Sequence, residues 1–400
     1  MSRKFRLAYL VSHPIQYQAP LLARISREPD IDLTVLFCSD LSVREYEDAE
    51  FKASFKWDVP LLSGYHHEFL PALGATDRLS YWRPMTTGLH HWIDRSRFDA
   101  LWVHGWGYFS HLRAIQLAKA RGMPVMVRGE SILQIRPRAW WKQAAREVLI
   151  RRVVRAADAH LAIGSWNRDF YLHYGADPTR VFPMPYAVDN DFFRARCEVA
   201  ARDREVLRRS LALEPGRPVI LYASKMTSRK RALDLLDAYI KLAPNRREPH
   251  PYLLFVGDGE LRPLLEQRTH EMGWDSLRFL GFKNQTELPA FFDLCDVFVL
   301  PSFDEPWGLV VNEVMNAGRA VIVSDQVGCG PDLVWHGENG WVFRAGNIEG
   351  LSAGLRFVLE NPEHTRALGE RSREIITNWG FEQDVQGLKQ ALNAIMRGAA

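Results

Sequence analysis

Short apolar runs alternate along this chain with longer stretches in which apolar residues recur at helical spacing. The runs show no alternation of period two, which indicates parallel strands buried on both faces of a sheet. The strands expected in the first half are Phe5–Ser12, Leu33–Ser39, Ala100–Gly105, Pro124–Arg128 and His160–Ser165, with a helix at Ser110–Arg121. Those of the second half are Val219–Ser224, Tyr252–Val256, Leu277–Phe282, Val297–Pro301 and Ala320–Ser324.

A polar, charged stretch near residues 190–217 separates these two series. The pattern predicts an α/β protein with two Rossmann-like, doubly wound domains that face each other across a cleft. Ligands of such sheets bind beyond the carboxyl ends of the strands, so we expect the chemistry of this protein there.

Composition narrows the class of protein. A chain of 400 residues predicts two or three domains, and 47% hydrophobic with 25% charged residues excludes a disordered or fibrous protein. A net charge of +3 argues against nucleic acid as a partner. No apolar run approaches the roughly 18 residues of a membrane span, and the basic start Met1–Arg6 lacks the features of a signal peptide. With four scattered cysteines, these features predict a soluble, cytoplasmic protein.

The segment with the strongest chemical signal is Ser302–Glu313, which follows the strand Val297–Pro301 and opens a helix to about Ala317. A helix N-terminus offers unpaired N–H groups that suit phosphate, and a glycine at position 308 lets the backbone approach a ligand closely. Glu305 and Glu313 lie eight residues apart, and carboxylates accept hydrogen bonds from vicinal diols. The alternative is a surface glutamate with a second glutamate that caps the helix.

A second cluster, Ser224–Arg231, holds four basic residues directly after a strand, where they would neutralise a diphosphate. A solvated run of charges is the alternative. Gly257-Asp258-Gly259 is only a weak dinucleotide fingerprint. Two Asp-x-Asp pairs, Asp30–Asp32 and Asp189–Asp191, leave open a divalent cation between carboxylates.

Taken together, these segments resemble the retaining glycosyltransferases of the GT-B fold, glycosyltransferase family 4. The resemblance rests on Glu305-x7-Glu313 with Pro306-Trp307-Gly308 inside it, and on Ser224–Arg231. Further matches, in order, are Val256–Gly259, Phe279–Phe282, Ser324–Gly328 and Gly337–Gly340. Val181–Phe193 resembles the crossing between the family's domains, which gives Asp189–Asp191 a non-metal explanation. His13–Tyr17 resembles the opening of one subgroup.

The resemblance implies a role for each matched residue. Lys225 and Lys230 would hold the donor diphosphate, Glu313 the ribose and Glu305 the transferred sugar. Backbone groups near Gly308 and Leu309 would complete the phosphate site. Phe282 and Lys283 would face the base. The remaining residues assigned to the donor site are Trp307, Gly257, His13 and Gln16.

The family also implies the organisation of the chain. We expect an acceptor-side domain at 1–192 and a nucleotide-sugar domain at 193–379, with a final helix at 381–397 packed back on the first domain. The donor would be a nucleotide sugar such as a UDP- or GDP-sugar. Transfer would retain the anomeric configuration, without a protein nucleophile and without a metal cofactor.

Three departures from the family matter. Lys225 stands where the family has arginine, which keeps the charge but loses the bidentate fork. His13–Tyr17 replaces a glycine pair. Arg128-Gly129-Glu130-Ser131 stands where the family often has histidine, so Glu130 or His104 is expected to take over that catalytic position. A nucleotide-sugar epimerase of the same fold and a catalytically silent partner subunit remain alternatives.

Residues 136–155 suggest where the acceptor is found. Seven basic residues accompany one acidic residue, Glu147: Arg136, Arg138, Lys142, Arg146, Arg151, Arg152 and Arg155. Trp141, Ala145, Leu149 and Val153 recur at intervals of four. Such a helix is suited to lie on an anionic membrane. The hypothesis is peripheral attachment to the inner leaflet and a lipid-linked glycan acceptor, as in bacterial surface-polysaccharide or lipopolysaccharide synthesis. The alternative is a helix that packs this apolar stripe on the sheet.

Overall fold

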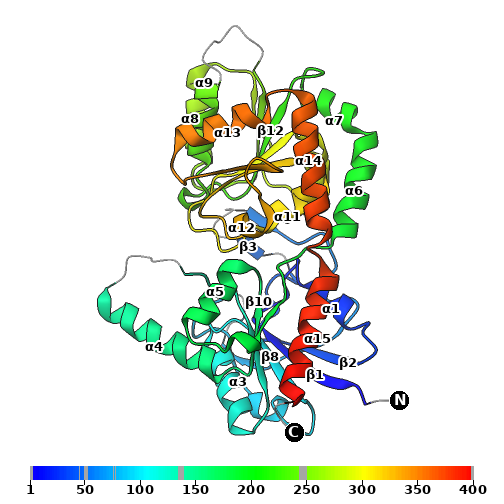
Figure 1. The fold of residues 1–400 in the computed structure, drawn as a ribbon, viewed down its shortest axis with the longest axis vertical. Helices are drawn as coiled ribbons and strands as arrows, with labels where there is room; N and C mark the ends of the chain where they lie inside the picture. The colour runs from blue at the N-terminus through cyan, green and yellow to red at the C-terminus, as the bar shows by residue number, and fades with distance from the viewer. Residues whose placement is uncertain are drawn as a thin grey trace. The chain divides into compact units, whose positions relative to one another are not determined.

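The computed structural model describes residues 3–44, 46–48, 53–74, 76, 78–133, 139–242 and 250–397. Contacts between residues divide the chain into two compact units (Figure 1). Unit 1 comprises residues 1–46, 59–186 and 380–400, and unit 2 comprises 47–58 and 187–379. The chain therefore passes between the units at 186/187 and again at 379/380, and the short segment 47–58 joins unit 2.

Unit 1 is built on a seven-stranded sheet in the order β11-β10-β9-β8-β1-β2-β5. Its strands are β1 (Phe5–Val11), β2 (Ile31–Phe37), β5 (His66–Phe69), β8 (Ala100–His104), β9 (Val125–Arg128), β10 (Ala159–Ala162) and β11 (Val181–Pro183). All neighbouring strands pair in parallel. The expected parallel sheet is confirmed, and each expected strand matches an observed one to within three residues at its ends.

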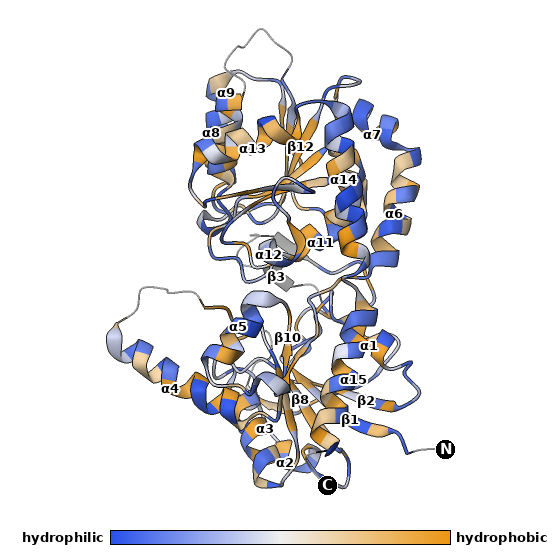
Figure 2. Cartoon of the chain, viewed as in Figure 1, coloured by the Kyte–Doolittle hydropathy of each residue, from blue (hydrophilic) through white to orange (hydrophobic). Residues whose placement is uncertain are grey.

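Helices cover both faces of this sheet. They are α1 (Ala19–Ile25), α2 (Leu89–Trp92), α3 (Phe109–Ala120), α4 (Trp140–Ala156), α5 (Ser165–His173) and α15 (Phe381–Arg397). Alternate residues of β1 separate the two cores: Leu7 and Tyr9 pack with α1 and α15, whereas Ala8 and Leu10 pack with α3, α4 and α5. Two small ribbons pair β3 (Tyr46–Asp48) with β4 (Ala53–Phe55), and β6 (Ala72–Leu73) with β7 (Met85–Thr86). The apolar strands stand out in Figure 2.

The last helix, α15, belongs to the interior of unit 1. Leu388, Ala391 and Ile395 are buried in the same core as β1. A β-carbon at Gly387 would lie 1.7 Å from the carbonyl oxygen of Pro183, so only glycine lets this helix approach β11 so closely. Unit 1 is thus completed by residues almost 200 positions beyond the end of β11.

Unit 2 has a six-stranded parallel sheet in the order β14-β13-β12-β15-β16-β17. Its strands are β12 (Val219–Ala223), β13 (Tyr252–Val256), β14 (Leu277–Phe279), β15 (Val297–Leu300), β16 (Ala320–Ser324) and β17 (Gly340–Phe343). Its helices are α6 (Asn190–Arg202), α7 (Arg204–Ser210), α8 (Ala232–Leu242), α9 (Arg262–Met272), α10 (Leu288–Leu294), α11 (Leu309–Asn316), α12 (Gly330–Leu333), α13 (Ile348–Val358) and α14 (Pro362–Thr377). The polar stretch near 190–217 is therefore mostly helical, with α6 and α7 inside unit 2. Within the described parts of the chain, none of the helices has the length and hydropathy of a membrane span.

Candidate functional site

The two segments singled out in the second half of the sequence lie side by side in unit 2. Ser224–Arg231 follows β12, and the loop 302–308 follows the neighbouring strand β15. The backbone N–H of Phe303 donates to the carbonyl of Arg229 at 2.7 Å, and the Arg229 guanidinium donates to the carbonyl of Asp304 at 3.2 Å. Lys230 and Glu305 form an ion pair with each side chain 12% exposed. The structure thus brings together two residues that the family resemblance assigns to a ligand.

Close backbone contacts hold the first of these segments in place. Gly257 has φ +123°, and a β-carbon there would lie 2.1 Å from the carbonyl oxygen of Ser224. The N–H of Met226 donates to the carbonyl of Asp258 at 2.8 Å, and the hydroxyl of Tyr222 donates to the carbonyl of Lys225 at 2.8 Å. The loops after β12 and β13 therefore support each other, and this close approach is the reason for glycine at 257.

Loop 302–308 leads directly into the N-terminus of α11, whose first residue is Leu309. Gly308 has φ +96°, and a β-carbon there would lie 2.9 Å from the Leu300 side chain, so the turn requires glycine. The N–H of Glu305 donates to Gln326 at 3.0 Å, and the N–H of Gly328 donates back to the Glu305 carbonyl at 2.9 Å. A helix N-terminus beside Lys230 is a suitable seat for an anionic group.

Glu313 lies on α11, one turn into the helix. Burial raises the pKa of this carboxyl group to about 8. The side chain of Trp307, in contrast, is 3% exposed and donates from Nε1 to Asn312 at 3.0 Å. Trp307 therefore packs inside unit 2. The sequence pattern gives no sign of this packing, and the family resemblance puts Trp307 among the ligand contacts.

The loop at Phe282 and Lys283 follows β14 at the same end of the sheet. The Lys283 ammonium lies 3.4 Å from the Glu287 carboxylate and 5.8 Å from the ring centre of Phe291. Residues from far upstream support this loop, because Asp58 accepts from the N–H of Thr286 at 3.1 Å. Sequence reasoning placed Asp58 in the domain 1–192 and did not foresee this contact.

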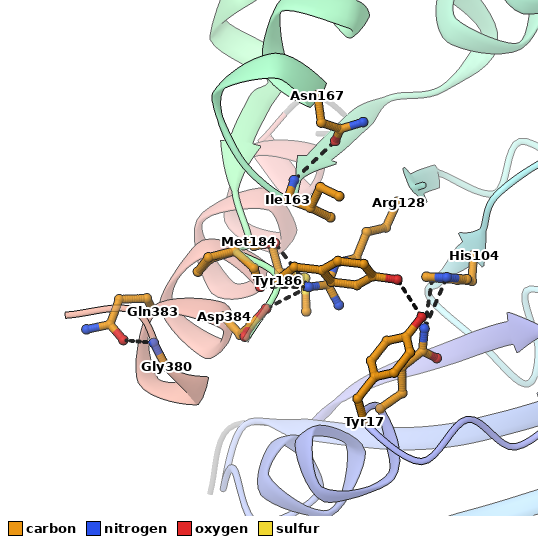
Figure 3. A network of polar contacts seen from close by, with 12 residues as sticks. Tyr17, His104, Arg128, Ile163, Asn167, Met184, Tyr186, Gly380, Gln383 and Asp384 are labelled. Atoms are coloured by element: carbon orange, nitrogen blue, oxygen red, sulfur yellow. Dashed lines mark hydrogen bonds and ion pairs between the residues drawn. The ribbon is translucent and has the colours of Figure 1, made fainter. Parts of the chain in front are cut away.

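In unit 1, Glu130 lies just beyond the carboxyl end of β9 and is exposed. Its Oε1 accepts from the Tyr17 hydroxyl at 3.1 Å and from the Tyr186 hydroxyl. The two hydroxyls lie 2.6 Å apart, a contact drawn as a dashed line in Figure 3. Two tyrosines from distant parts of the chain thus fix the orientation of an exposed carboxylate.

His104 ends β8 and is more enclosed. The side-chain amide nitrogen of Gln18 lies 3.1 Å from a ring nitrogen of His104, and the oxygen of that amide accepts from the Tyr9 hydroxyl at 2.7 Å. Burial holds the pKa of His104 well below its usual range, so the ring is neutral. His13, after β1, is also neutral because burial lowers its pKa to about 4, and Gln16 lies partly buried in the turn before α1.

The end of β9 is fixed by a buried ion pair. Arg128 and Asp384, which are 1% and 0% exposed, lie 3.0 Å apart (Figure 3). The same guanidinium donates to the carbonyls of Met184 and Pro185 at 3.1 and 2.8 Å. Since Gly129 and Glu130 follow Arg128 directly, α15 holds the segment that carries Glu130. The only sequence signal was an arginine at the end of an apolar strand.

One aspartate of each Asp-x-Asp pair has a partner within the protein. Asp189 caps α6 by accepting from the N–H of Phe192 at 3.0 Å, and Asp30 pairs with Lys389 at 2.8 Å. Among the residues that the structure describes, no group of three or more His, Cys, Asp or Glu side chains is placed to hold a metal ion.

The expected basic helix is present as α4, although Arg136 and Arg138 lie outside the described residues. Its packing face differs from the expected stripe. Ile150, Val153 and Val154 are buried, whereas Trp141 and Leu149 are 56% and 38% exposed. The interpretation that the stripe Trp141–Val153 packs on the sheet is wrong for all but Val153, because the interior takes the face one residue further round.

Comparison with known proteins defines the class. Residues 203–375 match the family Glycosyl transferases group 1, and residues 16–187 match the Glycosyl transferase 4-like domain. The solved structure of Anabaena Alr3699/HepE in complex with UDP aligns with a TM-score of 0.74 at 16% identity, over 98% of this chain and 100% of that one. The fold is the GT-B fold of glycosyltransferases. The chain belongs to the group 1 glycosyltransferases, family 4.

Two curated relatives match this chain over only part of their own length. Sulfoquinovosyl transferase SQD2 of Arabidopsis thaliana is 27% identical over 268 residues, which make up 65% of this chain and 50% of that protein. The GDP-mannose-dependent alpha-(1-6)-phosphatidylinositol monomannoside mannosyltransferase of Mycobacterium tuberculosis is 29% identical over 247 residues, 60% of this chain and 62% of that protein. The chain thus spans about half of the first relative and three-fifths of the second.

Proposed function

We propose that this protein is a retaining glycosyltransferase that moves a sugar from a nucleotide-diphosphate donor to a glycan or lipid-linked acceptor. The observation that carries this proposal is the Lys230–Glu305 pair beside the N-terminus of α11. Purified protein, a nucleotide sugar and a simple glycan acceptor test it by NMR of the product. A product with the donor's anomeric configuration supports the proposal. Formation of a donor epimer instead of a glycoside identifies an epimerase. If neither a glycoside nor an epimer forms, the protein is a silent subunit.

Positioning and charge stabilisation carry the chemistry in this proposal. The donor diphosphate lies against Lys225, Lys230 and the N–H groups at Gly308 and Leu309. Negative charge grows on the leaving phosphate as the glycosidic bond breaks, so these groups stabilise the transition state more than the bound substrate. The departing phosphate takes the acceptor proton on the same face of the sugar, and the anomeric configuration is retained.

The two unit 1 candidates take different roles. Glu130 is exposed and oriented by two tyrosine hydroxyls, so we assign it a direct contact with a hydroxyl group of the substrate. His104 is neutral and lies against Gln18, which suits a hydrogen-bonding role but not that of a cation. Glu130→Gln, which keeps the shape and removes the charge, is therefore expected to lower turnover more than His104→Gln.

The donor base is proposed as uracil or guanine. One solved neighbour holds UDP, and one curated relative is named for GDP-mannose. Thermal shift with UDP, GDP and ADP separates these, because a ligand at 100 times its Kd adds roughly 2.7 kcal/mol to the free energy of unfolding. A shift with ADP alone would contradict the choice of bases.

We propose a cytoplasmic protein that attaches peripherally to the inner face of the membrane through α4. Trp140 and Trp141 are 82% and 56% exposed on this helix, beside Lys142 and Arg146. Exposed tryptophans with neighbouring cations suit an anionic bilayer surface. Figure 2 shows this mixture of apolar and charged positions along α4. A membrane-bound enzyme of this class would act on a lipid-linked glycan, as in surface-polysaccharide assembly.

Co-sedimentation with liposomes tests this attachment. Wild-type protein is expected to pellet with anionic vesicles at low salt and to be released at high salt. Trp140→Ser combined with Trp141→Ser should abolish pelleting. Trp335→Ser, at a tryptophan 39% exposed in unit 2, is the control that should not. Equal pelleting of all three proteins, or none by the wild type, would contradict the proposed membrane contact.

A further inference from the structure

Two residues that flank the passages of the chain between its units contact the helix that carries Glu313 or the loop that leads into it. Trp379 is the last residue of unit 2 before the passage at 379/380, and Asn190 lies four residues after the passage at 186/187. Both are far in sequence from α11, which spans Leu309–Asn316. Of the residues that they touch, only Trp307 is among the proposed ligand contacts.

The first contact is a stack of two indole rings. Trp307 and Trp379 have ring centres 5.5 Å apart and planes inclined by 17°. Trp307 is 3% exposed and lies two residues after Glu305 in loop 302–308. The stack therefore fixes the part of that loop between the Lys230–Glu305 pair and the N-terminus of α11.

The second contact is a chain of hydrogen bonds between side-chain amides. The side-chain nitrogen of Asn316 donates to Asn190 Oδ1 at 2.8 Å and to the Asn312 carbonyl at 2.9 Å. Asn190 donates in turn to the carbonyls of Ile376 at 3.1 Å and Trp379 at 3.2 Å. Asn312 and Asn316 are 0% exposed. Buried amides keep their partners because water cannot replace them.

These contacts set the rotation of α11 about its own axis. Asn312 and Asn316 lie four residues apart and therefore on one face, while Glu313 is turned by about 100° from Asn312. A side chain reaches about 6 Å from the helix axis, so a rotation of about 10° moves the carboxylate by about 1 Å. A misplacement of that size in a group that contacts the substrate can cost up to about 100-fold in rate.

We propose that Asn190 and Trp379 are positioning residues of the donor site. Nucleotide binding is then coupled to how well ordered the backbone is at the two passages, 186/187 and 379/380. The inference rests on the proposed function, because it takes Glu305 and Glu313 as donor contacts. Coupling is reciprocal in binding free energy. If the passages hold α11 in its binding orientation, a nucleotide on α11 must in turn stabilise the passages.

Hydrogen exchange tests this reciprocity on the full chain. The probe is UDP or GDP, whichever gives the larger thermal shift. Bound nucleotide is expected to slow exchange at least threefold at residues 186–190 and 376–380, and to leave α7, which packs before the start of β12, unchanged. Binding without protection of these residues overturns the inference alone. Absence of binding by both nucleotides overturns the proposed function with it.

Variants supply a second readout. Trp379→Ala is expected to raise the KM for donor about tenfold and to leave the KM for acceptor unchanged, while Trp379→Phe keeps a ring and recovers most of the loss. Asn190→Ser removes the side-chain amide that contacts Asn316 and should raise the KM for donor even if Trp379→Ala does not fold. The control, Trp335→Ala, should change neither constant. Equal changes in both KM values, or no rescue by phenylalanine, would show that these residues only pack and do not position the donor site.

Discussion

Lys230 and Glu305 are 75 positions apart in sequence and form an ion pair at the ends of adjacent strands, β12 and β15. Each side chain is 12% exposed, so the pair lies largely out of water. Breaking such a pair from one side leaves the other charge without compensation. In the proposed enzyme Lys230 also faces the diphosphate, so it serves both the loop and the ligand.

Replacing Lys230 is therefore expected to affect turnover most. Lys230→Ala should lower kcat about 10- to 100-fold, because a charge-assisted contact is worth about 1.5–3 kcal/mol. Steady-state kinetics with the native donor measure this. Lys241→Ala, at an exposed pair with Glu349, is the control and should stay within twofold of wild type. Normal turnover of Lys230→Ala would remove this residue from the site.

Glu313 predicts a particular dependence of stability on pH. Burial raises its pKa to about 8 in the folded protein, so the folded state keeps a proton that the unfolded state has already lost. The free energy of unfolding therefore falls as pH rises from about 4.5 to about 8, by up to a few kcal/mol. Urea unfolding at pH 5 and pH 8 should show a smaller fall in Glu313→Gln than in wild type. An identical fall in both proteins would contradict the assignment.

Gly328 predicts that a single methyl group will disturb loop 302–308. A β-carbon there would lie 1.9 Å from the carbonyl oxygen of Pro306, a backbone atom that cannot move aside alone. Gly328→Ala should lower the free energy of unfolding by about 1–3 kcal/mol and weaken nucleotide binding. Gly330→Ala is the matched control, with its nearest neighbour at 3.8 Å. Thermal melts with and without nucleotide measure both effects, and indistinguishable variants would refute the close contact.

Replacing Asp384, the partner of the buried Arg128 at the end of β9, is expected to cause a large loss of stability. Asp384→Ala leaves the guanidinium of Arg128 buried without its carboxylate, which should cost about 3–5 kcal/mol. Glu382→Ala on the same helix removes a carboxylate that is 71% exposed and should cost less than about 1 kcal/mol. Chemical denaturation of the two variants provides the comparison. A smaller loss for Asp384→Ala than for Glu382→Ala would show that the buried pair is not stabilising.

A chelator is expected to leave activity largely intact. Lys225, Lys230 and the N-terminus of α11 supply positive charge to the diphosphate without a cation. Activity measured before and after EDTA treatment checks this. Complete loss that manganese or magnesium restores would return attention to Asp189 and Asp191.

The order of strands and helices could be predicted because buried parallel strands leave a simple record of continuous apolar runs. Glu305, Gly308 and Glu313 could be named because they lie close together in sequence, on one loop and one helix. Tyr17 and Tyr186, in contrast, reach Glu130 from 113 and 56 positions away. Such contacts follow from how the strands are ordered in the sheet, and no local pattern reports them.

The same limit explains the differences in α4 and in residues 47–58. Helical periodicity shows that α4 has an apolar side, but Trp141 and Leu149 stay exposed because the sheet covers a face turned toward Ile150 and Val154. A short excursion such as the one ending at Asp58 carries no apolar period of its own. Its place in unit 2 depends on partners at Asn284 and Thr286.

The position of α15 has a consequence for synthesis on the ribosome. Residues 1–186 emerge long before the helix that completes their fold, and the rest of the chain, about 210 residues, takes about 10–40 s to translate. During that interval Arg128 lacks its carboxylate, and the surface that Leu388 and Ile395 later cover is open. Unit 2 is fully translated first, although it begins later. Synthesis therefore completes unit 2 before unit 1, although most of unit 1 is translated earlier.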